Sequence, residues 1–126
     1  YKDRALRRYR YRKLLRENFI SQMGVFWRRS FAEEVGLLDE SLMYTMDYDY
    51  WLRMGVRHDP VILDRVLARF RWHDRSKSGK VNRAQFDEQY AVACRYFQGD
   101  RVSQAIHRFN VEKIVWSYRL LRLLGR

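Results

Sequence analysis

The stretch from Met46 to Gly55 constrains this chain more than any other, because it joins a charged beginning to an apolar body. Asp47 and Asp49 stand at the expected start of a helix, and Gly55 stands at its expected end. A carboxylate near a helix N-terminus is stabilised by free backbone N–H groups and by the helix dipole. Either Asp could therefore be held ionised and serve as a base. Both could equally do no more than cap the helix, as most such Asp residues do.

The chain has 126 residues, the size of one ordinary domain, and 47% of them are hydrophobic, which is enough for a core. No apolar run reaches the roughly 18 residues that a membrane-spanning helix needs. The single Cys94 cannot form an internal disulfide, which fits a reducing compartment. We expect Cys94 to be buried filler in a helix.

The net charge of +11 is concentrated at the two ends of the chain. Residues 1–16 carry eight Lys or Arg against one Asp, and residues 100–126 carry six against two acidic residues. Residues 17–99 hold twelve charged residues of each sign. This distribution predicts a balanced globular centre with basic flanks that face an anionic surface or partner.

Hydrophobic periodicity predicts a basic helix within each flank, over residues 3–16 and 101–124. The second of these is amphipathic and carries Trp116 and Tyr118 among its basic residues. Such a helix can lie on an anionic membrane surface, or it can pack on its own domain.

Capping-box spacing, in which Ser or Asn is followed three residues later by Glu or Gln, predicts helix starts at Ser30 and Asn82. These helices would end at Gly36 and near Phe97, with the helix over 46–54 between them. β-Branched and aromatic runs predict short strands at residues 19–27, 61–63 and 66–72.

Two polar clusters follow apolar elements and could carry chemistry: Asp47 with Asp49, and His73 with Ser76 and Ser78. A carboxylate and a His can bind a divalent metal or share acid–base work. Cations and hydroxyls in a loop can hold phosphate. Neither cluster is specific by itself, and a lone His after a strand is more often structural than a ligand.

The order of several short motifs is more specific than any one of them. The motifs are Asn18–Gln22, Val25–Arg29, Glu34–Gly36, Leu38–Leu42, Met46–Arg53, Leu67–His73 and Ser76–Ser78. Over roughly residues 17–98, this ordered set closely resembles the C-terminal half of the GT-A catalytic domain of family 2 glycosyltransferases. The resemblance implies an α/β fold, namely the C-terminal part of a GT-A (nucleotide-diphospho-sugar transferase) fold, mostly helical with two or three short strands.

The resemblance also implies a reaction, the inverting transfer of a sugar from a nucleotide-diphospho-sugar to an acceptor hydroxyl. Asp47 matches the catalytic base, although Met46 replaces the commoner acidic neighbour. Asp49 matches a second, often acidic position that orients the helix or the acceptor. Arg53 matches an Arg that supports the site through a charge pair, and His73 matches a His that ligates the metal or contacts the diphosphate in some relatives. The remaining matches are to diphosphate-binding and acceptor-side positions: Ser76, Lys77, Ser78 and Gln22.

The nucleotide-binding half of that family, which ends in an Asp-x-Asp metal motif, has no counterpart in these residues. We therefore expect the chain to be the acceptor-side half of a longer enzyme, unable to transfer sugar alone. A divalent metal, Mg or Mn, would be bound mostly by the missing N-terminal half.

The expected partners are a nucleotide-sugar donor, a glycan or lipid-linked acceptor, an anionic membrane surface and a second copy of the chain. Such enzymes commonly serve bacterial polysaccharide biosynthesis, so we expect a cytoplasmic location, peripheral at the inner face of the membrane. The alternative hypothesis is a non-catalytic basic module that binds nucleic acid or an anionic membrane surface through residues 1–16 and 100–126.

Overall fold

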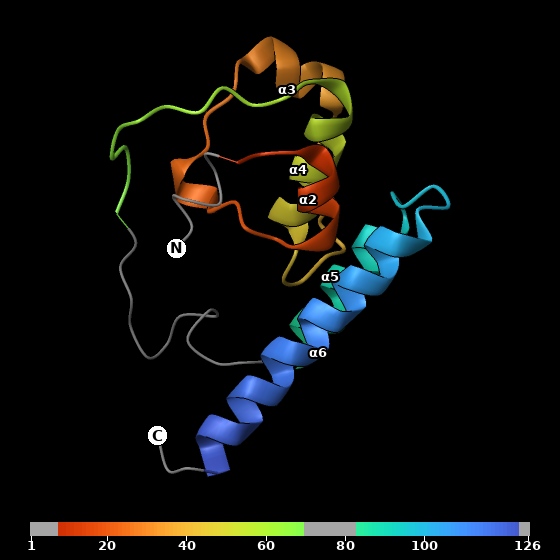
Figure 1. Cartoon of the computed structure of the whole chain (residues 1–126). Helices are drawn as coiled ribbons and strands as arrows, with labels where there is room; N and C mark the ends of the chain where they lie inside the picture. Colours follow the sequence, from red (N-terminus) through yellow and green to blue (C-terminus); the bar gives the residue numbers. More distant parts are fainter. Residues whose placement is uncertain (1–7, 70–82, 124–126) are drawn as a thin grey trace.

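The computed structural model describes residues 8–69 and 83–123, with the backbone alone described for 121–123, and every regular element in these ranges is helical (Figure 1). The elements are α2 (Tyr11–Arg16), the 3-10 helix η1 (Gln22–Gly24), α3 (Arg29–Val35), α4 (Met46–Arg57), α5 (Arg83–Cys94) and α6 (Arg101–Leu123). Helix α2 packs on α4 and α6, and α5 packs on the same two helices. The four helices therefore close a ring of contacts around a shared core.

The expected α/β fold, with the sheet of a GT-A domain, is wrong for the residues that the structure describes. Residues 19–27 contain η1 in place of a strand, and residues 61–69 run in neither helix nor strand. Their apolar side chains are exposed, at 86% for Val61 and 87% for Val66. A strand forms only where a neighbour pairs its backbone N–H and C=O groups, and no other described segment does so. Residues 70–72 of the last predicted strand lie outside the described residues.

Helix α4 confirms the expected start at Met46 but continues through Gly55 to Arg57. Gly55 is needed for a close approach of the chain's N-terminal part. A Cβ at this position would lie 2.7 Å from Tyr9 Oη and 2.8 Å from Tyr11 Cδ2. The sequence pattern indicated a helix end, whereas the glycine makes room for two rings in the last turn of the helix.

Helix α3 begins one residue before the predicted cap, at Arg29, and no side chain caps it. Glu33 pairs with Arg29 at 3.0 Å and does not close the expected capping box with Ser30. The predicted end of this helix is confirmed, because Gly36 follows it with φ of 90°, a conformation that favours glycine.

The two basic helices differ in how far they extend. Helix α6 matches the expected span almost residue for residue, whereas α2 starts only at Tyr11, after extended backbone at Arg10. Residues 1–7 lie outside the described residues. Cys94 is exposed at the end of α5, so its expected burial is wrong. None of the described helices combines the length and the apolar composition that crossing a bilayer requires.

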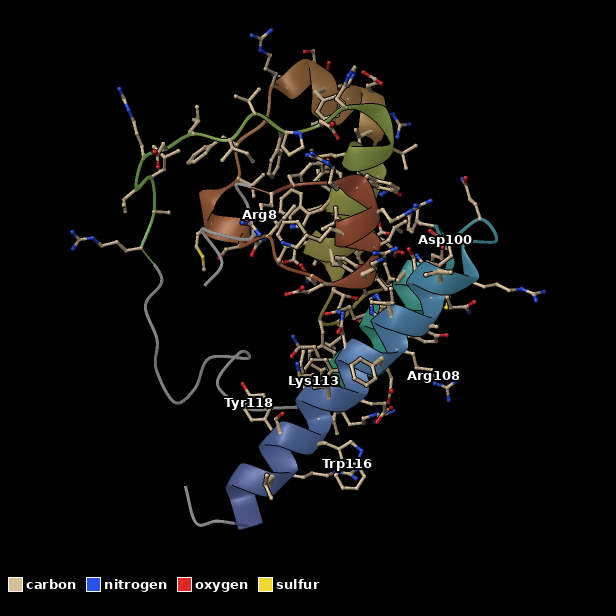
Figure 2. The ribbon with its side chains drawn as sticks, in the orientation of Figure 1. Arg8, Asp100, Arg108, Lys113, Trp116 and Tyr118 are labelled. Atoms are coloured by element: carbon tan, nitrogen blue, oxygen red, sulfur yellow. The ribbon has the colours of Figure 1, made fainter. Side chains whose placement is uncertain are left out.

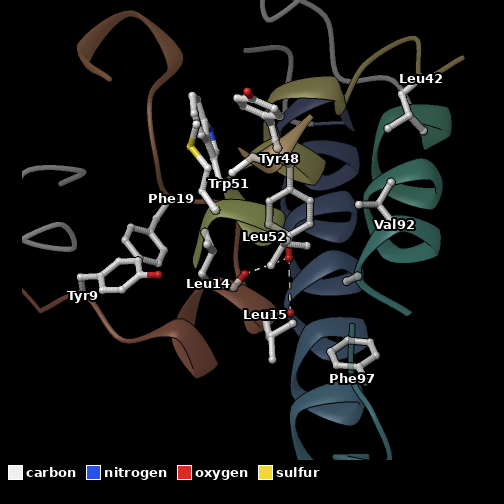
Figure 3. Packing of buried hydrophobic residues seen from close by; sticks show 14 residues of the cluster. Tyr9, Leu14, Leu15, Phe19, Leu42, Tyr48, Trp51, Leu52, Val92 and Phe97 are labelled. Atoms are coloured by element: carbon white, nitrogen blue, oxygen red, sulfur yellow. Dashed lines mark hydrogen bonds between the residues drawn. The ribbon is translucent and has the colours of Figure 1, made fainter. Parts of the chain in front are cut away.

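The core is organised around Tyr48 of α4, whose side chain is completely buried (Figure 3). The same cluster contains four further side chains that are at most 1% exposed: Leu14, Phe19, Leu52 and Val92. The Tyr48 hydroxyl donates to the carbonyl oxygen of Leu14 at 2.8 Å, in the last turn of α2, where this oxygen otherwise accepts only a long backbone hydrogen bond from Glu17 at 3.4 Å. This one side chain therefore fixes α4 against α2.

His107 of α6 is a second buried polar anchor. Its Nδ1 lies 2.7 Å from the Leu15 carbonyl oxygen, and its Nε2 lies 3.3 Å from the Gln89 side-chain amide. The rings of Tyr48 and Tyr90 lie near the imidazole. Burial lowers the pKa of His107 despite the backbone hydrogen bond. A neutral imidazole with its proton on Nδ1 satisfies both partners and joins α2, α5 and α6.

Candidate functional site

Asp47 lies in the first turn of α4 and is partly exposed. Its Oδ1 accepts a hydrogen bond from the backbone N–H of Tyr48 at 2.7 Å. The positive end of the helix dipole lies at the same place and favours the charged form of the carboxylate. Asp47 is therefore an oxygen acceptor in the first turn of the helix, partly within reach of solvent.

Asp49, two residues later, is held in a different way. It is only 2% exposed, and its Oδ2 accepts from Arg53 Nε at 2.9 Å. Its Oδ1 accepts from the Tyr96 hydroxyl at 2.8 Å and lies 3.7 Å from Arg95 Nη1. Both oxygens already have donors, so this carboxylate could take a proton from a substrate only by giving up buried contacts.

Arg53 extends this network beyond its ion pair with Asp49. Its Nη1 donates to the Val35 carbonyl oxygen at 3.3 Å, which joins α4 to the last residue of α3. The guanidinium carbon lies 4.9 Å from the centre of the Tyr50 ring, within cation–π range. Arg53 and Asp49 together hold the helix that presents Asp47.

Glu88 of α5 holds the loop directly before α4. Its carboxylate accepts hydrogen bonds from the backbone N–H groups of Met43, Tyr44 and Thr45, at 2.8 to 2.9 Å. The Thr45 hydroxyl donates to the same carboxylate at 2.9 Å. Burial alone would raise the pKa of Glu88, but these four hydrogen bonds outweigh it and lower the pKa. Glu88 therefore fixes the position of the N-terminus of α4 and, with it, the position of Asp47.

Sequence reasoning missed Glu88, which is 43 to 45 residues away from the loop residues that it holds. A Glu within a helix has no local signal that distinguishes it from a solvated one. The short polar loop before Met46 showed only that several backbone N–H groups there would need acceptors.

An aromatic cluster lies on the α4 turn that follows Asp47. The Trp27 ring lies 5.7 Å from both the Tyr50 and the Trp51 rings, in edge contact with each. Tyr50 and Trp51 are buried, whereas Trp27 is 44% exposed. Residues three and four positions apart share one side of a helix, so the cluster lies on the same side of α4 as Asp47. Trp27 thus presents a partly exposed ring that is supported by two residues on the same side of α4 as Asp47.

The other predicted site residues are not joined to Asp47 within the described residues. Gln22 is exposed in η1, and no described contact connects it to α4. His73, Ser76, Lys77 and Ser78 lie outside the described residues. Their expected roles in binding the metal and the diphosphate stay predictions.

A divalent metal would need several ligands in one place. The described residues contain no group of three or more His, Cys, Asp or Glu side chains arranged to hold such an ion. Asp47 could supply one oxygen, but these residues do not by themselves form a metal site. The metal therefore stays an expectation from the resemblance.

A hollow of about 550 Å³ lies away from this site, on the outer side of α6. It is open to solvent, and the described residues that line it all come from this helix: Phe109, Glu112, Lys113, Trp116, Ser117 and Leu120. Asp47 does not line it, so the hollow and the candidate site are separate features.

Comparison of the chain with protein-family models, with curated proteins and with solved structures found no match.

Proposed function

We propose that this chain supplies the acceptor side of an inverting glycosyltransferase. Asp47 would accept the proton of an acceptor hydroxyl as that oxygen forms its bond to the anomeric carbon of the donor sugar. The bond between the anomeric carbon and the diphosphate breaks in the same displacement, and the nucleoside diphosphate leaves. The observation that carries the proposal is a partly exposed carboxylate in the first turn of α4, followed one turn later by two buried rings that support the exposed Trp27.

Trp27 gives this proposal an acceptor contact. One face of many sugar rings is lined by C–H groups, and a flat indole can cover that face and bury its apolar area. The buried Tyr50 and Trp51 rings hold Trp27 in place, so little side-chain freedom is lost on binding. Asp47 would then act on a hydroxyl of a sugar acceptor held against Trp27.

The donor nucleotide and the divalent metal, Mg or Mn, would be bound mainly by residues outside this chain, as the resemblance implies. The expected acceptors are a glycan or a lipid-linked sugar. We place the enzyme in the cytoplasm, and peripherally at the inner face of the membrane where the acceptor is lipid-linked.

The test is sugar transfer by the longer enzyme that contains these residues. Asp47→Asn should lower kcat by about 10² to 10⁴ while the KM for acceptor changes little, because a general base is lost and binding is kept. Trp27→Ala should raise the acceptor KM with a smaller effect on kcat. Glu40→Gln, at an exposed carboxylate in a turn, is the matched control. Transfer at a near-normal rate by Asp47→Asn would refute the proposed base.

The alternative proposal is a non-catalytic basic module that binds nucleic acid or an anionic membrane. Arg8, Arg10 and Arg12 are exposed at the described part of the N-terminal flank, which favours contact with an anionic partner. On this proposal Asp47→Asn changes nothing, and binding to the anionic partner weakens steeply with salt.

A further inference from the structure

Helix α6 carries apolar side chains on two opposite sides. Its inner side packs on α2 and α5 and includes Val111 and Val115, which are 4% and 5% exposed. Its outer side carries four exposed apolar residues, here called the α6 stripe: Val102, Phe109, Trp116 and Leu120. Their spacings of seven, seven and four residues bring them to one side of a helix with 3.6 residues per turn.

The α6 stripe is exposed to an extent that is unusual for large apolar residues. The exposed fractions are 63% for Val102, 67% for Phe109, 64% for Trp116 and 58% for Leu120. The last three also line the hollow of about 550 Å³ on the outer side of the helix. A contiguous exposed apolar surface of this kind marks an interaction site more often than scattered single residues do.

The far part of α6 extends past the elements that support its beginning (Figures 1 and 2). Among the described residues, its last polar contact with another helix joins Glu112 to Arg83 at the start of α5, at 2.8 and 3.1 Å. Figure 2 shows Trp116 projecting from the helix beyond this point, away from α2 and α4. None of the described elements therefore covers the outer side of α6 in this part of the helix.

The charge around the α6 stripe identifies the class of partner. Arg108 and Arg119 each directly precede a stripe residue, and Lys113 lines the hollow between Phe109 and Trp116. The Arg119 guanidinium lies 5.8 Å from the centre of the Trp116 ring. The acidic side chain of Glu112 is already paired with Arg83 and adds little negative charge. The partner must therefore match an apolar stripe with a basic border.

An anionic bilayer meets both requirements. Phe and Trp rings are favoured at the boundary between headgroups and acyl chains, and Lys and Arg beside them are attracted to lipid phosphates. A second copy of the helix would bring two positively charged borders together and would be opposed by their repulsion. A nucleic acid would match the charge, but Val102 and Leu120 have no ring to stack on a base.

We propose that the α6 stripe docks this chain on an anionic lipid surface. Phe109, Trp116 and Leu120 enter the headgroup boundary, while Arg108, Lys113 and Arg119 contact lipid phosphates. This inference does not depend on sugar transfer, and it would hold for a chain with no catalytic role.

The test is cosedimentation of the purified chain with vesicles of phosphatidylcholine, with or without about 30% phosphatidylglycerol. We expect binding to the anionic vesicles and at least about tenfold weaker binding to the neutral ones. The double variant Phe109→Ala with Trp116→Ala should weaken binding to anionic vesicles by about tenfold or more. The matched control is Phe26→Ala, which removes a ring that is 70% exposed elsewhere on the molecule. Circular dichroism checks that each variant keeps its helices.

The double variant Lys113→Gln with Arg119→Gln tests the basic residues separately, because it leaves the α6 stripe intact. It should weaken binding to anionic vesicles and reduce the salt dependence of that binding. Equal binding to neutral and anionic vesicles would overturn the proposal, and so would an unchanged affinity of the Phe109 and Trp116 variant. A dimer in sedimentation analysis that the same variant abolishes, without vesicle binding by the wild type, would assign the stripe to a second copy. Binding to duplex or single-stranded DNA without vesicle binding would assign it to nucleic acid.

Discussion

Replacing Asp49 with Asn tests whether Asp49 has a structural role in α4 that Asp47 does not share. The change removes a negative charge from a site that is 2% exposed and keeps nearly the same shape. The Asn oxygen could still accept from the Tyr96 hydroxyl, but an amide NH₂ would then face Arg53 Nε, which now lies 2.9 Å from a carboxylate oxygen. The charge of Arg53 would be left without its closest partner.

The expected cost follows from the burial of that ion pair. Removing one partner of a buried pair typically costs 3 to 5 kcal/mol, since the other charge remains desolvated. The Asp49 side chain is 3% exposed and that of Arg53 is 22% exposed, so water relieves part of the penalty. We therefore expect a loss of about 3 kcal/mol, a large part of the 5 to 15 kcal/mol that holds a typical domain folded.

Urea unfolding followed by far-ultraviolet circular dichroism measures this loss. With a slope of about 1.5 kcal/mol per molar urea, the midpoint should fall by about 2 M. Asp47→Asn is the matched control, because it makes the same chemical change two residues earlier in the same helix. It should cost less than about 1 kcal/mol, the usual size of a helix-dipole contribution.

Two results would contradict this reasoning. If both variants shifted the midpoint equally, the buried network around Asp49 would carry no more stability than the exposed helix start. If the double variant Asp49→Leu with Arg53→Leu were much less stable than Asp49→Asn, the cost would come from lost packing and not from the uncompensated charge.

Three further substitutions test the anchors around α4. Glu88→Gln should destabilise the chain by about 2 kcal/mol near neutral pH. The folded pKa of Glu88 is lowered, so its contribution is present above the unfolded pKa and is lost as the pH falls through the folded pKa. The urea midpoints of variant and wild type should therefore converge as the pH is lowered into the acid range. Gly55→Ala should lower the melting temperature, because the new methyl group would lie 2.7 Å from Tyr9 Oη. Such overpacking costs about 1 to 3 kcal/mol, which exceeds the gain of about 1 kcal/mol in helix propensity. A higher melting temperature for the variant would show that the Tyr9 ring moves freely. Tyr48→Phe should cost about 1 to 2 kcal/mol, since the Leu14 carbonyl oxygen loses a buried donor, and hydrogen exchange should then speed up in α2 more than in α6.

The prediction of strands failed for a reason that lies outside the segments themselves. Residues 61–69 have the β-branched composition of a strand, yet composition gives only a preference for a pleated, half-buried surface. The backbone pairing that makes a strand comes from a neighbour, and no described residue provides one here. A helix pairs its backbone within itself, which explains why the long periodic span of α6 could be predicted almost to the residue.

The candidate site divides in the same way between local and long-range information. The sequence placed Asp47 and Asp49 together at one helix start and offered both as catalytic. Only the packing of α4 against residues 95 and 96 distinguishes them, because Arg95 and Tyr96 close over Asp49 and leave Asp47 accessible. Glu88 also acts across more than forty residues of chain, where no local pattern reports it.

The sequence by itself determined the existence of α3, α4, α5 and α6, the Gly36 stop and the basic character of the two flanks, since each depends on residues within a few positions of one another. The tertiary structure decided which side chains are buried and which helix faces stay uncovered. The free-energy cost of burying a charge or of exposing a large apolar surface depends on neighbours that are distant in the chain. The tertiary structure therefore decided that Gly55 lies within a helix, that Cys94 is exposed and that the outer stripe of α6 is open.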